Sequence, residues 1–279
     1  MKFGLFGGAR AKGGPAGDSH AYHDFVNYVV EAEKLGFSSV FLVEHHFTGF
    51  GQVSASMSLL AYLAARTERI RLGTAVVVLP WHNPILVAEQ AATLDLLSNG
   101  RLDFGVGKGY RDYEFAGFCI PQNEATERFD EAMEVIRKAW TSPGRFSYHG
   151  KRWRFDNVVV EPSPIQQPHP PFWLGAGSAE SIRRAAREGY NLLLDQIAPT
   201  LAVARKAISV SGIFGMYATT RSPRPTPSAR SPPATAATCV ESSPHVSSAS
   251  GRSSDAWSTA TAFGSRSPAD LRSVSMFSA

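Results

Sequence analysis

The sequence predicts an α/β protein of the (β/α)8 TIM-barrel type, incomplete with six of its eight strands, followed by a tail rich in Ser, Ala and Pro. Short apolar stretches alternate with amphipathic ones over brief connections, a pattern typical of parallel strands joined by right-handed helical crossovers. The glycine-rich loop after the first stretch lacks a Rossmann fingerprint, which disfavours a doubly wound sheet. A complete barrel of eight strands takes about 250 residues, so six strands within the first 194 residues match the usual length of one strand–helix unit.

Each predicted strand is a short run rich in branched aliphatic and aromatic residues. The six runs are residues 2–7, 38–43, 70–79, 102–107, 172–175 and 191–194. Residues 146–155, centred on His149-Gly150, predict a hairpin inserted into the alternation of strands and helices.

Helices are predicted between these strands, where apolar residues recur at intervals of three and four. They cover about residues 21–35, 55–65, 83–99, 124–140 and 179–188. In the first helix, Phe25, Val29, Ala32 and Leu35 lie on or near one face. The third begins at Asn83-Pro84, a capping residue followed by proline at the first helical position.

The composition of the chain changes near residue 200, which divides it into a partial barrel over residues 1–200 and a low-complexity tail over residues 201–279. The tail contains 18 Ser, 14 Ala, 7 Thr and 7 Pro, together 46 of its 79 residues. Such a segment buries too little apolar surface to offset the entropy of ordering it, so we expect disorder. Its origin is either a genuine linker-like tail or translation in another reading frame. We favour the frameshift, because the break falls inside an unfinished barrel.

The charge of the chain is also unevenly distributed. The tail holds eight Lys and Arg against three Asp and Glu, so the first 200 residues hold 20 against 21 and are nearly neutral. This balance argues against a nucleic-acid surface on the folded part. No stretch is apolar enough for a membrane span, no signal peptide is visible, and no metal-ligand spacing occurs. We therefore expect a soluble, cytoplasmic protein without a metal.

The segment Glu44-His45-His46-Phe47-Thr48-Gly49 follows the buried run 38–43 and carries the strongest functional signal. In parallel α/β folds, the chemistry lies at the carboxyl ends of the strands. An imidazole titrates near neutral pH, so it can accept and return a proton there. Adjacent strand residues face opposite ways, so at most one of the two histidines is expected to face a ligand.

The turn Gly175-Ala176-Gly177-Ser178-Ala179-Glu180-Ser181 joins a predicted strand to a predicted helix. Backbone N–H groups there, with the hydroxyls of Ser178 and Ser181, could form a cradle for an anion at the helix N-terminus. The alternative is an ordinary glycine turn and helix cap.

Several motifs in register carry a family resemblance. They are Met1-Lys2-Phe3-Gly4, Glu44–Gly51, Gly73–Pro80, Gly100-Arg101 and Gly105-Val106-Gly107-Lys108-Gly109-Tyr110. In this order they resemble the bacterial luciferase-like flavin-dependent monooxygenases, particularly the luciferase α-subunit branch, over about residues 1–198.

The resemblance implies a binding site for reduced FMN at the barrel mouth, with His45 as the catalytic histidine beside the flavin. Lys108 stands where luciferases carry an arginine for the FMN phosphate, and Gly177, Ser178 and Ser181 would meet the same phosphate. Ala75 and Val76 match the small-residue bulge against which the flavin ring packs. Two charged residues, Glu114 and Arg128, occupy positions that resemble polar residues near the flavin, although either could be a solvated charge.

The implied activity is that of a monooxygenase that uses reduced FMN and O2, through a flavin hydroperoxide, to oxidise a small organic substrate. A separate flavin reductase would supply the reduced cofactor, and a dimer is expected by analogy. Two alternatives remain open: a deazaflavin-dependent reductase or dehydrogenase with the same barrel, and an inactive relative that lacks the closing strands. The motifs do not identify the substrate.

Overall fold

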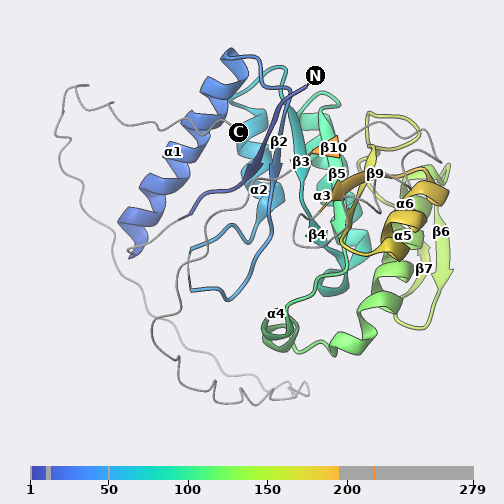
Figure 1. Ribbon diagram of the computed structural model, residues 1–279. Helices are drawn as coiled ribbons and strands as arrows, with labels where there is room; N and C mark the ends of the chain where they lie inside the picture. Colours follow the sequence, from blue (N-terminus) through green and yellow to red (C-terminus); the bar gives the residue numbers. More distant parts are fainter. Residues whose placement is uncertain (1, 11–13, 50, 195–215, 218–279) are drawn as a thin grey trace, which may run out of the picture. The chain divides into compact units, whose positions relative to one another are not determined.

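The computed structural model describes residues 2–10, 14–49, 51–194 and 216–217, all of which belong to one compact unit. Seven strands of this part, most of which are labelled in Figure 1, pair side by side in one curved, parallel sheet. Their order across the sheet is β1 (Gly4–Gly7), β2 (Ser39–Leu42), β3 (Arg71–Thr74), β5 (Leu102–Gly107), β8 (Phe172–Ala176), β9 (Asn191–Leu194) and β10 (Met216–Tyr217). The parallel barrel-type sheet and its six predicted strands are confirmed.

The strand β10 was not predicted. It pairs in parallel with β9 through Met216 and Leu192, so the sheet continues beyond the predicted boundary at residue 200. That boundary and the rest of the predicted tail lie outside the described residues and stay predictions.

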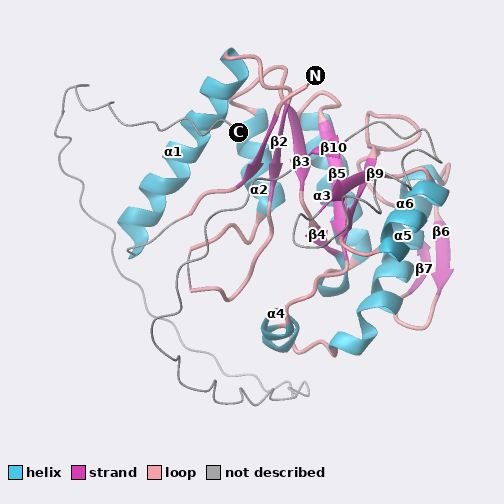
Figure 2. Ribbon diagram, in the orientation of Figure 1, coloured by secondary structure: helices cyan, strands magenta, loops and turns pink. Residues whose placement is uncertain are grey.

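Helices alternate with the strands along the chain, and several of them pack against the sheet (Figure 2). They are α1 (Gly14–Lys34), α2 (Ser56–Ala64), α3 (Pro84–Leu97), α4 (Asp112–Gly117), α5 (Ala125–Thr141) and α6 (Ala179–Glu188), with short 3-10 turns η1 (Leu79–Trp81) and η2 (Gln122–Glu124). The predicted cap of α3 is confirmed, because the Asn83 side chain accepts N–H bonds from Ile85 and Leu86. No helix of the described part combines the length and apolar character needed to cross a membrane. A cytoplasmic location stays a prediction.

Two helix predictions were wrong in detail. The first helix begins at Gly14 rather than near residue 21, and Leu35, expected on its buried face, is 79% exposed. The chain leaves the helix at Lys34 and turns through Gly36, whose φ is +90°, so Leu35 no longer follows the helical face. Val26 is buried on that face instead. The short helix α4 was not predicted at all.

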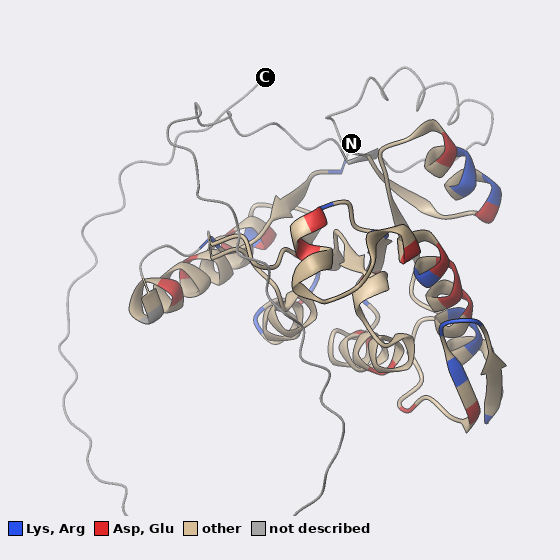
Figure 3. Ribbon diagram, turned by 90° about the horizontal axis from the view of Figure 1, so that it is seen from below, with Lys and Arg blue, Asp and Glu red and all other residues tan. Residues whose placement is uncertain are grey.

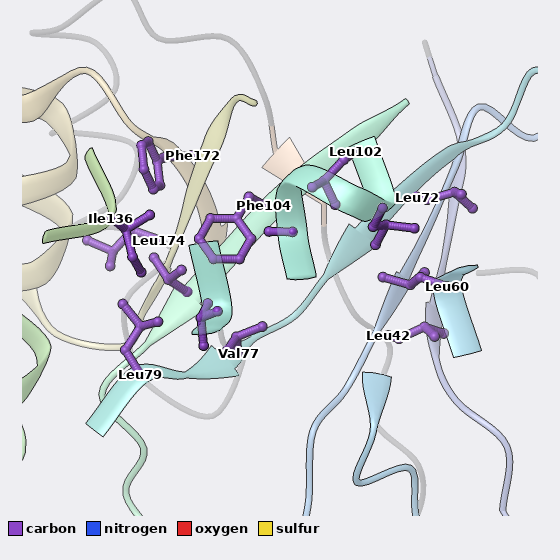
Figure 4. Close-up of a cluster of buried hydrophobic side chains, with 14 of the residues drawn as sticks. Leu42, Leu60, Leu72, Val77, Leu79, Leu102, Phe104, Ile136, Phe172 and Leu174 are labelled. Carbon is purple, nitrogen blue, oxygen red and sulfur yellow. The ribbon is translucent and has the colours of Figure 1, made fainter. Parts of the chain in front are cut away.

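The core lies on both faces of the sheet. All residues of β2 and β5 are buried, as expected for parallel strands covered on both sides. Figure 4 shows part of this cluster, in which strand residues meet the inward residues of the helices. Its labelled members are Leu42, Leu60, Leu72, Val77, Leu79, Leu102, Phe104, Ile136, Phe172 and Leu174.

The predicted hairpin is confirmed as β6 (Phe146–His149) and β7 (Arg154–Val158). Its loop is fastened to α5, because the Glu131 carboxylate accepts the backbone N–H groups of Lys151, Arg152 and Trp153. Arg152 also pairs with Glu127 at 2.8 Å, so basic residues of the loop face acidic residues of the helix (Figure 3).

The third predicted strand, residues 70–79, is divided by a bulge. Gly73 pairs with Asp103, and Val77 pairs with Val106, so three residues on one strand face two on the other. The separate short strand after the bulge is β4 (Val77–Val78), which pairs with β5, and the Ala75–Val76 peptide bond within the bulge is cis. The predicted small-residue bulge is therefore present.

The Thr74 hydroxyl continues the sheet where regular pairing stops. It accepts the N–H of Gly105 at 2.8 Å and donates to the Gly105 carbonyl at 2.7 Å. This close approach leaves no room for a side chain, since a Cβ at Gly105 would lie 1.7 Å from the Thr74 carbonyl oxygen. The bulge therefore depends on glycine at position 105.

At the opposite ends of the strands, Glu33 joins α1 to the start of β3. Its carboxylate accepts the backbone N–H groups of Glu68, Arg69 and Ile70, at 3.1, 2.7 and 2.7 Å. Burial alone would raise the pKa of Glu33, but these N–H bonds outweigh it and lower the pKa below its usual 4.5.

We expect Glu33→Gln to lower the free energy of unfolding at neutral pH. A carboxyl group whose folded-state pKa lies below its unfolded-state value stabilises the fold above the unfolded-state pKa, and this contribution is lost as the pH falls through the folded-state pKa. The stability difference between wild type and variant should therefore be largest near neutral pH and shrink in acid. Urea unfolding across this range measures it, with the exposed Glu31→Gln, which pairs with Lys34, as control. A difference that stays constant with pH would contradict the role of the ionised carboxylate.

Candidate active site

The predicted site residues follow the carboxyl ends of neighbouring strands. His45 comes after β2, Ala75 and Val76 after β3, Lys108 directly after β5, and Gly177 directly after β8. Because these strands are parallel and paired in order, their carboxyl ends meet at one edge of the sheet. These four strand-end positions therefore lie along the same edge of the sheet, whereas Glu114 and Arg128 lie on helices α4 and α5.

The side chain of Val76 brings three of these segments into contact. A Cβ at Gly107, the residue before Lys108, would lie 2.5 Å from Val76 Cγ2. A Cβ at Gly175, two residues before Gly177, would lie 3.0 Å from Val76 Cγ1. Val76 thus occupies the space that side chains at both glycines would need, and it packs the bulge against the ends of β5 and β8.

His45 is bound to Glu114, which lies on α4, 69 positions along the chain. The distance from His45 Nδ1 to Glu114 Oε1 is 3.3 Å, and the same oxygen accepts the backbone N–H of His46 at 2.9 Å. The Glu114 side chain is 3% exposed, so of its two predicted environments the solvated one is wrong. A contact between Glu114 and the flavin stays a prediction.

His45 also lies beside a cation, the guanidinium of Arg111, whose Nη2 is 3.4 Å from His45 Nε2. Burial lowers the pKa of His45, and the positive charge of Arg111 lowers it further. The carboxylates of Glu114 and Glu44 act in the opposite direction without reversing the shift. The arrangement therefore favours a neutral imidazole, which is the form that accepts a proton.

His46 has a different carboxylate partner. Its Nε2 lies 3.1 Å from the buried Glu44 Oε1, which is also 2.7 Å from His82 Nε2. Burial would raise the pKa of Glu44, but the hydrogen bonds from His46 and His82 outweigh it and lower the pKa. The side chains of the two adjacent histidines thus have different carboxylate partners, although both residues lie beyond the end of β2. That only one of them faces a ligand stays a prediction. The role of His82 was missed, because the sequence gives no motif around it.

Aromatic rings enclose His46. Its ring centroid lies 4.7 Å from that of Phe118 and 5.5 Å from that of Trp81, and these two rings stack on each other. The indole Nε1 of Trp81 is buried without a hydrogen-bond partner among the described residues. His46 therefore packs in a cluster of aromatic rings, next to the paired side chains of His45 and Glu114.

The two predicted cations have different surroundings. The Lys108 side chain is exposed, with Nζ 3.4 Å from the Thr126 hydroxyl, so its charge is available to an anion. Arg128 donates to Glu124 at 2.9 Å, one helical turn before it. The partner of Arg128 is thus a carboxylate of its own segment, and a contact with the flavin stays a prediction.

The turn before α6 is a helix cap. Ser178 Oγ accepts the Ser181 N–H at 3.2 Å, and Ser181 Oγ accepts the Ser178 N–H at 3.1 Å, which is a reciprocal capping box. The alternative of an ordinary cap is therefore present in the structure. A cap and an anion site are compatible, because a helix N-terminus keeps its partial positive charge, and a Cβ at Gly177 would meet nothing within 4 Å.

These groups fit a phosphorylated, planar cofactor. An exposed lysine and a capped helix N-terminus suit the phosphate, and the bulge at Ala75 and Val76 offers a small apolar surface for a ring. Among the described residues, no group of three or more His, Cys, Asp or Glu side chains could hold a metal ion.

The fold and the site together define a class, the barrel-type α/β proteins with a histidine–carboxylate site at the carboxyl ends of parallel strands. Within this class, the chain belongs to the luciferase-like monooxygenase family, whose sequence model matches residues 1–241. The match runs past residue 198, where we expected the resemblance to stop.

Two curated relatives are flavin or aldehyde oxygenases by name. The oxygenase component of the flavin-dependent trigonelline monooxygenase from Acinetobacter baylyi is 31% identical over 69% of this chain and 53% of its own length. The alkanal monooxygenase alpha chain of Photorhabdus luminescens is 32% identical over 61% of this chain and 46% of its own length. The chain thus spans about half the length of the curated relatives it matches.

Solved structures agree with the fold. Monooxygenase RslO1 from Streptomyces bottropensis is 32% identical and has a TM-score of 0.70, over 77% of this chain and 68% of its own. The oxygenating constituent of 3,6-diketocamphane monooxygenase from Pseudomonas putida, in complex with FMN, has a TM-score of 0.66 at 19% identity, over 76% and 63%. An F420-dependent secondary alcohol dehydrogenase has a TM-score of 0.62 at 19% identity, over 76% and 65%. The last two show the fold alone.

Proposed function

We propose that this chain is the oxygenase component of a two-component flavin-dependent monooxygenase, which uses reduced FMN and O2 to oxidise a small organic substrate. The observation that carries the proposal is the junction at Val76, which packs the small-residue bulge between the segment leading to Lys108 and the turn leading to Ser178. The family membership and the trigonelline and alkanal monooxygenase relatives support it.

In this proposal Lys108 and the Gly177–Ser181 turn would hold the FMN phosphate, and Ala75 and Val76 would face the ring. Reduced FMN, when bound, supplies the electrons that activate O2. His45 would accept and return a proton through Nε2 once Arg111 releases that nitrogen, and its lowered pKa keeps the imidazole neutral beforehand. Glu114 would hold the imidazole in place. The flavin hydroperoxide implied by the family resemblance stays a prediction.

Titration of the full chain with FMN, oxidised and reduced, tests this function, with circular dichroism as a check on folding. Saturable binding of FMN supports the proposal. Preferential binding of a deazaflavin would favour the alternative, a reductase or dehydrogenase such as the F420-dependent neighbour. Absence of any flavin binding by a folded chain would reject both and favour an inactive relative.

We expect Ala75→Phe to weaken FMN binding by roughly tenfold or more, which corresponds to about 1.4 kcal/mol. Ala75 is only half buried, so a phenyl ring there would project into the space assigned to the flavin rather than into the core. Ala75→Ser is the matched control, because it keeps the residue small. Equal FMN affinity in wild type and Ala75→Phe would remove the bulge from the binding site.

The proposed partners are a separate flavin reductase, which supplies reduced FMN, and a second copy of the chain. Four large apolar side chains on α2 and α3 are substantially exposed, which supports a dimer through these helices. They are Tyr62, Leu86, Leu96 and Leu97. Light scattering measures the oligomeric state, and O2 consumption that requires an added flavin reductase would support the two-component system.

A further inference from the structure

Arg111 directly precedes α4 and lies beside His45, and it belongs to none of the motifs that predicted the site. One guanidinium nitrogen, Nη2, is 3.4 Å from His45 Nε2. The others donate to the hydroxyls of Tyr113 at 2.6 Å and Tyr110 at 3.4 Å, and the guanidinium lies 5.5 and 5.9 Å from the centroids of the Tyr110 and Tyr113 rings. Two tyrosines therefore hold the cation against the imidazole.

The two partners of His45 require the same tautomer. An arginine guanidinium has donors and no acceptor, so His45 Nε2 must present its lone pair to Arg111. On the other side of the ring, Glu114 Oε1 already accepts the His46 N–H, and an ionised carboxylate only accepts. His45 Nδ1 must therefore carry the hydrogen and donate it to Glu114.

We propose that Arg111 is a positioning residue of this site, which with Glu114 holds neutral His45 in its Nδ1–H tautomer and keeps the hydrogen off Nε2. Because Nε2 has a single lone pair, it accepts a proton only when Arg111 releases it. The inference rests on the proposed function for its catalytic meaning, because that function makes His45 the base. Its structural content, the tautomer and its dependence on Arg111, stands independently of any flavin.

The charges that face His45 determine how its titration responds to Arg111. They are the Arg111 cation, Glu114 on α4, and Glu44 at the end of β2. Loss of the cation leaves two carboxylates beside the ring, and both favour the protonated imidazole. Removal of Arg111 should therefore raise the pKa of His45 and leave Glu114 alone to favour the Nδ1–H tautomer.

Nuclear magnetic resonance on the full chain labelled with 15N-histidine measures both quantities, because long-range proton–nitrogen correlations distinguish the tautomers. A His45→Gln spectrum assigns the signal. In wild type we expect the Nδ1–H form. In Arg111→Met the share of the Nδ1–H form should fall, because Glu114 alone is left to accept that hydrogen, and the titration midpoint of His45 should move upward. Arg111→Lys keeps a cationic donor and should restore part of both effects.

The matched control is Arg66→Met, which removes an exposed cation bonded to Tyr62 and leaves the site intact. It should leave the tautomer and the midpoint of His45 unchanged. An Nε2–H tautomer in wild type would overturn the inference, and so would an Arg111→Met spectrum identical to wild type. If Arg111→Met fails to fold, the wild-type tautomer and the lysine variant decide the outcome.

The result is separable from the proposed function, because neither readout needs a cofactor. The expected tautomer and shift without any FMN binding would reject the flavin proposal and retain the positioning role. FMN binding with an unaltered His45 signal in Arg111→Met would retain the flavin proposal and reject the positioning role.

Discussion

Replacing Gly105 with alanine is expected to destabilise the fold by more than about 4 kcal/mol, beyond what most single substitutions cost. The added Cβ would lie 1.7 Å from the Thr74 carbonyl oxygen. That oxygen belongs to the backbone, so relief requires β3 and β5 to separate and to break both hydrogen bonds of the Thr74 hydroxyl. Thermal and urea unfolding of the purified variant measure the loss.

The control for this substitution is Gly144→Ala, since a Cβ at Gly144 meets nothing within 4 Å. It should leave stability within about 0.5 kcal/mol of wild type. A Gly105→Ala variant as stable as the Gly144→Ala variant would show that the two strands move apart without cost. In that case the bulge does not depend on the close approach at Gly105.

Replacement of His45 by glutamine should reduce the protein-dependent oxidation of reduced FMN by O2 roughly 10²- to 10⁴-fold, the usual contribution of a positioned acid–base group. Glutamine keeps polarity and approximate size but cannot exchange a proton near neutral pH. The rate is followed by the return of the oxidised-flavin absorbance after mixing with O2.

His20→Gln is the control for the histidine variant, because His20 is exposed and pairs only weakly with Asp24, at 3.7 Å. It should leave the rate unchanged. FMN affinity should be nearly the same in both variants and in wild type, since His45 is assigned to proton transfer. An unchanged oxidation rate in His45→Gln would remove this histidine from the reaction.

The regular elements could be predicted because their signals are local. The run 102–107 became a strand with the predicted bounds, and the helix 179–188 has a serine cap and a left-handed glycine at its two ends. The bounds of α1 were wrong because few apolar residues mark its first turns. The six-residue helix α4 gives no sustained periodicity, and Arg111 before it makes no cap bond with its side chain.

The candidate site was predictable in part for the same reason. The motif around His45 and the strand ends on which the site stands are local features. The partners of the histidines are not: Glu114 is 69 positions from His45, and His82 is 38 positions from Glu44. Their contacts exist only because parallel strands bring distant loops to one edge. Arg111 was missed because its role depends on which way a single guanidinium turns.

The side chain of Val76 fills the space in which side chains at positions 107 and 175 would otherwise lie. Its two methyl groups lie where Cβ atoms at positions 107 and 175 would be. A larger residue at either position therefore requires a smaller residue at position 76. Among natural variants of this protein, drift in size at these three sites should therefore be linked, with alanine at 107 appearing beside a residue smaller than valine at 76. The surface formed by the bulge and the ends of β5 and β8 would then change its shape only through paired substitutions.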